Sequence, residues 1–491
     1  MNPTTQLYRP NLSLLTDLYQ LTMAYGYWKN GMAEREAVFH LFFRKNPFKG
    51  GYALAAGLEH AASFLSGFGF EEEDLAYLGT LAGNDGKPLF EPAFLDFLRD
   101  TPFSCDIDAM PEGTLAFPHE PLIRVRGPLF QGQLIETPLL TMVNFQTLIA
   151  TKSARICKAA QGDTVLEFGL RRAQGLDGGL SASRAAYVGG CHATSNVLAG
   201  RLFDIPVKGT HAHAWVMSFD TEPAAFKAYA DAMPNNCVFL VDTYDTLEGV
   251  KNAIEAGKAL RERGYEMVGV RLDSGDLAQL SIDARKLLDE AGFPEAKIVA
   301  SNDLNDHSIQ ALKAKGAQIA IWGVGTKLAT AYDQPALGGV YKLAAIRNAA
   351  GEYDFKVKLS NTPIKVSNPG VLQVRRYFQG DTPVGDMLYN TEQDPDTTEL
   401  HDPMEAGKTY PVPAHDRFED LLQPIFRSGQ LVADLPDIHT IRAYGLQQIA
   451  QAPSEITDLN EPAHYPVGLE SDLYKLKMHL IDKAKVQSTN A

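Results

Sequence analysis

Val268-Gly-Val-Arg-Leu-Asp-Ser-Gly-Asp276 begins as a short apolar run and ends in a cluster of charged side chains. The same pattern recurs in the middle of the chain, so that six apolar runs each lead into a polar cluster. The other five are Val165-Leu-Glu-Phe168 before Gly169-Leu-Arg-Arg172, Ile205-Pro-Val207 before Gly209-Thr-His-Ala-His213, Cys237-Val-Phe-Leu-Val241 before Asp242-Thr-Tyr-Asp245, Lys297-Ile-Val-Ala300 before Ser301-Asn-Asp303, and Ile319-Ala-Ile-Trp322 before Gly323-Val-Gly-Thr326. Buried parallel strands read as continuous apolar runs, and the chemistry of an α/β barrel collects where its strands end. The pattern therefore predicts parallel strands whose polar ends form one enzymatic site.

The apolar runs recur at intervals of roughly 20 to 40 residues between about 153 and 346, which is the spacing of βα units. Helical stripes lie between them, for example Leu247, Val250, Ile254 and Leu260 in the segment 246–263. Strands joined by crossover helices favour an irregular α/β barrel. An open doubly wound sheet is the alternative, but no G-x-G-x-x-G pattern follows the first strand.

The segments on either side of this region read differently. Residues 11–30 carry a helical apolar stripe, Asp106 to about Thr137 alternates apolar and polar residues, and Thr137-Pro138 opens a largely apolar helix. We therefore expect an α/β fold class with an additional α+β domain built from N-terminal and C-terminal segments. The expected divisions are an α+β domain over 1–150 that ends in a buried helix, the barrel over 151–347, and a segment over 348–491. This last segment either completes the N-terminal domain or forms a small third domain, and its end, 472–485, reads as an amphipathic helix.

The composition bounds the partners and the compartment. A net charge of −15 disfavours nucleic acid or an anionic membrane as the main partner, although a few arginines in a cleft can still hold a small anion. The four cysteines show no CxxC spacing, which suits a reducing cytosol. The N-terminus lacks the pattern of a signal peptide, and the longest charge-free stretch is too short to span a bilayer. A soluble cytoplasmic protein is the expectation.

Two of the polar clusters offer titrating or charged groups. His211 and His213 stand two residues apart at a strand end, where they could bind a metal, act as nucleophile or acid/base, or simply be hydrogen-bonded structural histidines. Arg271 suits bidentate recognition of phosphate, and Asp273 could hold Mg²⁺ or ribose hydroxyls. The alternative is a strand-end salt bridge, with Asp276 capping the next helix.

Two further clusters offer backbone and aromatic groups. Gly323-Val-Gly-Thr326 is a glycine loop between a strand and an expected helix, and its N–H groups could cradle a phosphate. Glycine loops also serve only to turn the chain, but the last βα loops of barrels are a frequent phosphate site. Phe168 adds a flat apolar surface, and Arg171 and Arg172 add positive charge beside it.

These residues resemble the nicotinate phosphoribosyltransferase family, which consists of type II phosphoribosyltransferases of NAD salvage. The similarity extends over nearly the whole chain and rests on several motifs in the family's order. They are Leu15-Thr-Asp-Leu-Tyr-Gln-Leu-Thr-Met23, Glu167-Phe-Gly-Leu-Arg-Arg172, Ser195-Asn-Val-Leu-Ala-Gly200, Gly209-Thr-His-Ala-His213, Val270-Arg-Leu-Asp-Ser-Gly-Asp-Leu277, Gly323-Val-Gly-Thr326 and Gly338-Gly-Val-Tyr-Lys342. Each motif is weak alone, and together they are highly specific.

The resemblance implies a reaction in which nicotinate and 5-phosphoribosyl 1-pyrophosphate give nicotinate mononucleotide and pyrophosphate, with Mg²⁺. It also implies coupling to ATP hydrolysis through a transiently phosphorylated histidine. His213 matches the phosphorylated position, whereas His211 falls on a variable one. A cytoplasmic homodimer with active sites shared between the subunits is implied as well.

The resemblance further assigns binding residues. Tyr19, reaching in from the partner subunit, and Phe168 should stack on the two faces of the pyridine ring, and Thr210 should contact nicotinate. Arg271 should lie beside the bound substrates. By the same matching, Gly323, Gly325 and Thr326 should hold the ribose 5-phosphate, and Asp273 should contact ribose or Mg²⁺. Arg171 is a candidate anion clamp because of its positive charge at a strand end.

Three other functions remain as alternatives. A nicotinamide phosphoribosyltransferase would need a carboxylate for the amide N–H, and the stretch Ser195-Asn196 lacks one. A metal-dependent barrel hydrolase built on His211 and His213 would need further ligands, for which His307 is the nearby candidate. A non-enzymatic binding module would be expected to lose the polar strand ends, yet all six are filled.

Overall fold

The computed structural model describes residues 11–360 and 362–489, and these form two compact units. We call the unit formed by Leu148–Pro335 and Ile438–Leu446 the α/β unit. The rest of the described chain, namely residues up to Thr147, Ala336–Asp437 and residues from Gln447 onward, is the α+β unit. The sequence prediction had placed its divisions after 150 and after 347. The N-terminal segment on which the expectation of no signal peptide rests lies outside the described residues.

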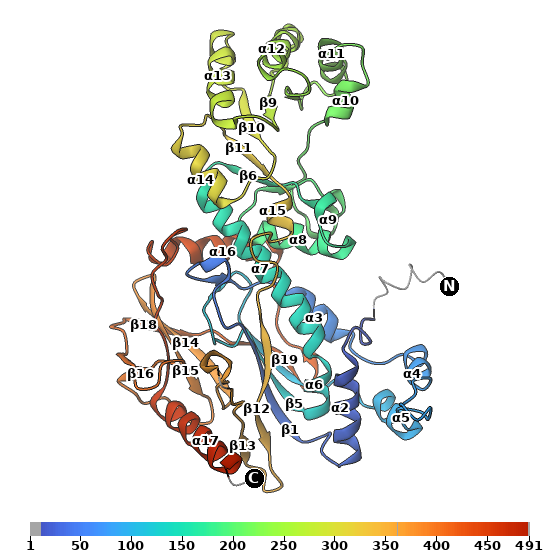
Figure 1. The fold of residues 1–491 in the computed structure, drawn as a ribbon, viewed down its shortest axis with the longest axis vertical. Helices are drawn as coiled ribbons and strands as arrows, with labels where there is room; N and C mark the ends of the chain where they lie inside the picture. The colour runs from blue at the N-terminus through green and yellow to red at the C-terminus, as the bar shows by residue number, and fades with distance from the viewer. Residues whose placement is uncertain (1–10, 361, 490–491) are drawn as a thin grey trace. The chain divides into compact units, whose positions relative to one another are not determined.

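The α/β unit is built on a parallel sheet with the strand order β7-β6-β11-β10-β9-β8. Figure 1 labels the four central strands β6, β11, β10 and β9. All its neighbouring strands pair in parallel. The strands are β6 (Thr164–Glu167), β7 (Ala193–Thr194), β8 (Val238–Leu240), β9 (Gly269–Leu272), β10 (Lys297–Ala300) and β11 (Ile321–Val324). The predicted α/β class is confirmed. The pairings form an open ladder from β7 to β8, and closure of this ladder into a complete barrel stays a prediction.

One of the six apolar runs does not become a strand. The run at Ile205–Val207 forms a single parallel bridge, between Val207 and Thr194. The short strand β7, which contains Thr194, takes the place next to β6 instead. The proline in Ile205-Pro-Val207 explains the difference, because proline lacks the N–H that a continuous ladder requires.

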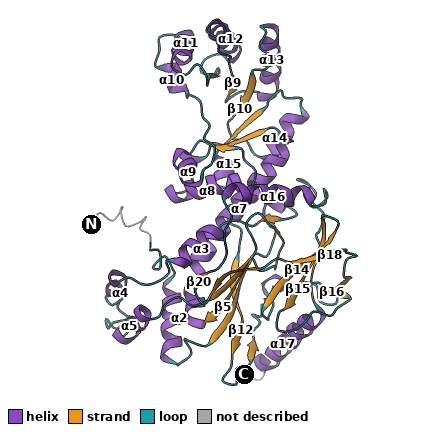
Figure 2. Ribbon diagram, turned by 180° about the vertical axis from the view of Figure 1, so that it is seen from behind, coloured by secondary structure: helices purple, strands orange, loops and turns teal. Residues whose placement is uncertain are grey.

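The helices of the α/β unit begin at residues that the strand ends supply. Asp245 Oδ1 accepts a hydrogen bond from Glu248 N at 2.9 Å, and Asp276 Oδ1 accepts one from Ala278 N at 3.1 Å, so both are helix N-caps. The predicted capping by Asp276 is thereby confirmed. Figure 2 shows α11, α12 and α13 side by side, with α12 and α13 next to β9. The helices are α8 (Leu176–Val188), α9 (Val197–Phe203), α10 (His213–Met217), α11 (Glu222–Ala232), α12 (Thr246–Glu262), α13 (Leu277–Glu290), α14 (Asp306–Ala314) and α15 (Thr326–Ala329), with the 3₁₀ turn η2 (Leu170–Arg172).

The α+β unit contains two larger sheets in which distant segments of the chain alternate. One has the order β13-β12-β1-β5-β3-β19-β20 and the other β17-β16-β21-β15-β14-β18, while β2 pairs with β4. The strands are β1 (Glu36–Phe42), β2 (Ala53–Leu54), β3 (Asp106–Ala109), β4 (Leu115–Ala116), β5 (Ile123–Pro128), β12 (Val340–Arg347), β13 (Tyr353–Phe355), β14 (Leu372–Gln379), β15 (Thr382–Asn390), β16 (Glu399–His401), β17 (Thr409–Pro411), β18 (Arg417–Asp420), β19 (Gln423–Arg427), β20 (Gln430–Leu431) and β21 (Val467–Leu469). Because β12 pairs with β1, the segment around Val340 belongs to this unit.

Helices cover the sheets of the α+β unit and contribute to its core. The helix expected within 11–30 is α2, which packs Leu21 and Ala24 into a buried cluster with Phe90 and Phe94. The helices are α2 (Leu18–Lys29), α3 (Leu58–Ser66), α4 (Glu72–Leu78), α5 (Pro92–Asp100), α6 (Leu129–Leu134) and α17 (Ser471–Thr489), with the 3₁₀ turns η1 (Pro47–Lys49) and η3 (Pro363–Lys365). Both α7 (Glu136–Ala160) and α16 (Ile438–Gln451) contain residues of each unit. Among the described residues, no helix is long and apolar enough to cross a membrane.

Candidate active site

The polar clusters of the α/β unit meet at one edge of its sheet. Since the strands are parallel, their carboxyl ends lie on the same side, and the register places Ala300 beside Leu272 and Val324 beside Glu167. The residues that follow these strand ends can therefore contact one another. The contacts made by Arg271 show that they do.

Arg271 contacts residues that follow β6, β9 and β10, and the loop that contains Thr210. Its Nε donates a hydrogen bond to Ser301 Oγ at 2.9 Å, and its Nη1 donates one to Thr210 Oγ1 at 3.1 Å. Its Nη2 lies 3.4 Å from Asp273 Oδ1, which also accepts a hydrogen bond from Ser301. The guanidinium carbon is 5.9 Å from the centre of the Phe168 ring. Thr210, Arg271, Asp273 and Phe168, each named from the sequence, thus lie in one constellation.

His213 is the first residue of α10 and stays accessible at this constellation. Its Nδ1 lies 3.1 Å from Thr243 Oγ1, and its Nε2 lies 3.8 Å from Asp273 Oδ2. The side chain of His213 is 41% exposed. A ring held from both sides and still reachable can exchange a proton or take up a phosphoryl group.

His211 has a different environment from His213. It is buried, and its Nε2 accepts a hydrogen bond from the backbone N–H of Leu240 at 3.3 Å. Its ring packs against Tyr229 with the centroids 4.7 Å apart. Burial lowers the pKa of His211 to about 4, so the ring is neutral near pH 7. Because the lone pair of Nε2 already accepts the hydrogen bond from Leu240, His211 is a structural histidine that fixes the loop to β8.

The structure does not support the two histidines as a metal pair. Within residues 11–360 and 362–489, no group of three or more His, Cys, Asp or Glu side chains is placed to hold a metal ion. His307, the proposed third ligand, is an exposed residue of α14. The metal-dependent hydrolase therefore loses its geometric basis.

A buried carboxylate orders the turn that carries Phe168. Glu167 is 1% exposed, and it accepts hydrogen bonds from Gly169 N, from Ser183 Oγ at 2.9 Å and from Thr194 Oγ1 at 2.6 Å. These donors come from the turn itself, from α8 and from β7. Glu167 thereby joins three elements at the point where the chain leaves β6.

The same turn packs directly on the predicted phosphate loop. Phe168 N donates a hydrogen bond to Val324 O at 2.8 Å. A Cβ atom on Gly323 would lie 2.7 Å from the Phe168 ring, and one on Gly169 would lie 2.8 Å from Gly325 O. Glycine is needed at both positions because a side chain would collide with the other loop. Phe168 and the loop at Gly325, from which α15 starts at Thr326, are therefore one packed substructure.

For two predicted site residues, Arg171 and Tyr19, the structure shows no contact with this constellation among the described residues. Arg171 is exposed on the turn η2, next to Phe168 in sequence. Tyr19 lies on α2 of the α+β unit and is 49% exposed. Their roles as anion clamp and stacking partner stay predictions.

Sequence reasoning left three neighbours of the constellation without a role. Ser301 bridges Arg271 and Asp273, and Thr243 contacts His213. Asp242 Oδ2 accepts hydrogen bonds from Asp273 N at 2.9 Å and from Ser274 Oγ at 2.6 Å. Their positions after predicted strands could have marked them as candidate site residues. The spacing along the sequence does not show which strand-end residues contact one another.

Models of a known protein family match most of the chain. The nicotinate phosphoribosyltransferase N-terminal domain matches residues 14–144, the nicotinate phosphoribosyltransferase family matches 164–361, and the corresponding C-terminal domain matches 373–477. The chain belongs to the nicotinate phosphoribosyltransferase family. The resemblance inferred from the motifs is confirmed.

Individual members of the nicotinate phosphoribosyltransferase family are similar over nearly the full length. The protein named nicotinate phosphoribosyltransferase from Bacillus subtilis is 46% identical over 484 residues, which covers 97% of this chain and 96% of that one. The human protein of the same name is 37% identical, with 94% and 95% covered. The crystal structure of human nicotinic acid phosphoribosyltransferase matches with a TM-score of 0.83 at 35% identity, covering 95% of this chain and 99% of that chain.

A more distant structure shares the fold. The nicotinate-nucleotide pyrophosphorylase from Pyrococcus furiosus matches with a TM-score of 0.68 at 22% identity, covering 90% of this chain and 98% of that one. The strand-end constellation is thus part of a fold found in nicotinate phosphoribosyltransferases and in this more distant structure.

Proposed function

We propose that the protein is a nicotinate phosphoribosyltransferase of NAD salvage, which joins nicotinate to 5-phosphoribosyl 1-pyrophosphate and releases pyrophosphate. The observation that carries the proposal is the Arg271 constellation, in which one guanidinium contacts Thr210, Ser301 and Asp273 at the sheet edge. This constellation occurs in a chain that belongs to the family and matches its members almost end to end.

The chemistry needs charge stabilisation and alignment more than a covalent nucleophile. Breaking the bond between C1 and pyrophosphate leaves positive charge on the ribose and negative charge on the leaving pyrophosphate. Arg271 and Arg171 would stabilise the negative charge on pyrophosphate. The pyridine nitrogen then forms the new bond to C1 if the ring is held in line. Stacking between Phe168 and the partner subunit's Tyr19 would hold it there, with Thr210 contacting the base. Gly323, Gly325 and Thr326 would hold the ribose 5-phosphate.

Mg²⁺ fits the carboxylates at this edge. Asp242 Oδ1 is buried and has no hydrogen-bond partner among the described residues. The other oxygen, Asp242 Oδ2, accepts a hydrogen bond from the backbone N–H of Asp273, so the two residues are in contact. Oxygen ligands of this kind suit a hard divalent cation. When bound, Mg²⁺ would neutralise pyrophosphate charge, with Asp273 and Asp242 as the residues that hold it.

ATP coupling would proceed through His213. An unprotonated ring nitrogen would form the N–P bond to the γ-phosphoryl group while the P–O bond to ADP breaks, and water would later release phosphate. The exposed ring between Thr243 and Asp273 supports this role. The phosphorylated ring would add negative charge next to Asp273 and so change the contacts of Mg²⁺ and pyrophosphate.

The assignment is tested with labelled nicotinate or nicotinamide and phosphoribosyl pyrophosphate, with and without ATP. We expect nicotinate mononucleotide from nicotinate, faster with ATP, and little product from nicotinamide. The stretch Ser195-Asn196 supports this preference, because Asn196 caps α9 through Ala199 N and no carboxylate stands there. Preferred turnover of nicotinamide would favour the alternative phosphoribosyltransferase instead.

His213→Ala is expected to abolish ATP-stimulated turnover and to leave slow, ATP-independent synthesis. The matched control is His307→Ala, because His307 is an exposed histidine on α14 to which the proposed reaction assigns no role. Initial rates with and without ATP, together with acid-labile ³²P incorporation from labelled ATP, measure the effect. If His213→Ala keeps full ATP stimulation, the phosphohistidine assignment is wrong.

A further inference from the structure

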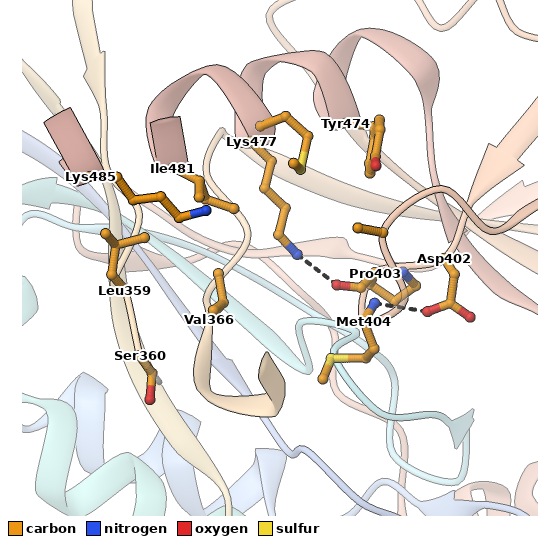
Figure 3. Close-up of a pocket in the computed structure, with 12 residues that line it drawn as sticks. Leu359, Ser360, Val366, Asp402, Pro403, Met404, Tyr474, Lys477, Ile481 and Lys485 are labelled. Atoms are coloured by element: carbon orange, nitrogen blue, oxygen red, sulfur yellow. Dashed lines mark hydrogen bonds between the residues drawn. The ribbon is translucent and has the colours of Figure 1, made fainter. Parts of the chain in front are cut away.

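A pocket of about 510 Å³ lies in the α+β unit, outside the Arg271 constellation. It is lined by one face of α17, by the loop around Pro403 and by residues near Ser360 (Figure 3). Its volume falls within the range of roughly 300–1,000 Å³ that is typical of small-molecule sites. No step of the proposed reaction uses this pocket.

Most of the pocket wall is apolar. Leu359, Val366 and Met404 line it, and Met478 and Ile481 contribute from α17. Methionine side chains adapt to ligands of varied shape because they are unbranched and polarizable. The wall therefore suits a ligand with a small apolar body.

One buried cation interrupts this apolar wall. Lys477 is only 5% exposed, and its Nζ donates hydrogen bonds to Asn368 Oδ1 at 2.8 Å and to Pro403 O at 2.7 Å. Both acceptors are neutral, so one N–H of the ammonium group is left for another partner. Within the described chain, Lys477 forms no ion pair with a carboxylate. Figure 3 shows its side chain extending from α17 into the pocket, with Lys485 extending from the same helix.

The carboxylate that shares the pocket is engaged elsewhere. Asp402 Oδ1 accepts hydrogen bonds from Met404 N at 2.8 Å and Glu405 N at 2.9 Å, and Oδ2 pairs with Lys408 at 3.4 Å. Burial lowers the pKa of Lys477 to about 8, and the negative charge of Asp402 offsets the cost of that burial only in part. A ligand anion would relieve that cost.

We propose that this pocket binds a small monocarboxylate with an apolar body, whose carboxylate pairs with Lys477. A single negative charge matches the single buried ammonium group, because Lys485, the other cation that lines the pocket, is exposed. A dianion such as phosphate would place surplus charge against apolar side chains and near Asp402. This inference is independent of the proposed reaction.

The test is binding of benzoate to protein carrying ¹³C-methyl-labelled methionine, followed by methyl NMR. We expect benzoate to shift the Met404 and Met478 resonances, which Met→Leu variants assign. Benzamide, which has the same shape and no charge, should bind at least about tenfold more weakly. Lys477→Met should weaken benzoate binding to a similar extent, whereas Lys477→Arg, which keeps the cation, should retain part of it.

Two controls keep the outcomes distinct. Phe168→Ala should leave the Met404 and Met478 shifts unchanged, because any binding of benzoate at the Arg271 constellation is separate from this pocket. The fold of each Lys477 variant is checked from its unbound methyl spectrum. The proposal is overturned if these two resonances stay still up to about 10 mM benzoate. Equal binding of benzoate and benzamide, or full binding by a folded Lys477→Met variant, would also overturn it.

Discussion

Glu167 shows how one buried side chain can order a reactive strand end. Its carboxylate is acceptor-only when ionised, and the three groups around it are the backbone N–H of Gly169 and the hydroxyls of Ser183 and Thr194. Charge-assisted hydrogen bonds of this kind are among the stronger ones in proteins. Glu167 does not line the site itself, but it fixes the residue that follows it, Phe168.

Glu167→Gln should therefore weaken nicotinate binding more than it slows turnover. The amide would turn an N–H₂ group toward at least one donor, at a cost of about 1–3 kcal/mol. If this cost displaces Phe168 from its binding position, KM for nicotinate rises about 5- to 150-fold while kcat changes little. Steady-state kinetics at saturating phosphoribosyl pyrophosphate measure both constants.

The control for this substitution is Glu262→Gln. Glu262 is an exposed residue at the end of α12, and its replacement should leave both constants unchanged. A Glu167→Gln enzyme that lost kcat at unchanged KM would contradict the positioning role. A lower melting temperature with unchanged kcat and KM would indicate that Glu167 has a purely structural role.

The two neighbouring histidines show where sequence reasoning stops at this scale. The motif placed His211 and His213 together at a strand end, and several roles for them remained open. The family resemblance placed only His213 on the phosphorylated position. The packing supplies the physical difference, because His211 is buried against Tyr229 and β8 while His213 faces the Arg271 constellation. Burial depends on distant residues that the local motif does not contain.

At the scale of elements, the turn after β6 and the loop after β11 act as one unit. Gly169→Ala would place a methyl group against Ala329 and 2.8 Å from Gly325 O, where a backbone atom cannot move cheaply. We expect a loss of about 1–3 kcal/mol in the free energy of unfolding and a higher KM for phosphoribosyl pyrophosphate. Urea denaturation and steady-state kinetics measure the two effects.

Gly178→Ala is the matched control on α8. A Cβ atom there meets nothing within 4 Å, and alanine is favoured over glycine inside a helix by about 0.5–1 kcal/mol. This variant should be as stable as the parent or slightly more so, with an unchanged KM. Equal behaviour of the two variants would show that the two loops do not depend on each other.

The apolar runs predicted most of the parallel strands for a simple reason. A strand buried on both faces has to be apolar throughout, so the pattern is local and readable. The exceptions were the run at Ile205–Val207, which contains a proline, and β7, which has only two residues. An element this short carries no periodicity from which it could be recognised.

At the scale of the whole molecule, the proposed shared active site makes a strong prediction. Tyr19→Ala and His213→Ala homodimers should each lack ATP-stimulated activity. Mixing, unfolding and refolding them together should restore it, because a heterodimer contains one site with both residues intact. Random pairing gives heterodimers in about half of the dimers, hence about a quarter of wild-type activity.

The measurement is ATP-stimulated product formation after refolding, compared with each variant refolded alone. The fraction of heterodimers can be followed with a tag on one chain. If heterodimers form and activity remains at the level of the parents, Tyr19 and His213 do not come from different subunits.

The sequence by itself determined most of the parallel strands of the α/β unit, the capping of α13 by Asp276 and the family, because each is encoded in short contiguous patterns. The tertiary structure decided which strand-end residues meet. It joined Thr210, Ser301 and Asp273 through Arg271, buried His211 and placed Glu167 beneath Phe168. It also brought β12 beside β1 and buried the Lys477 ammonium group against two neutral acceptors. These outcomes depend on contacts between residues far apart in the chain, and the spacing of residues along a sequence does not specify such contacts.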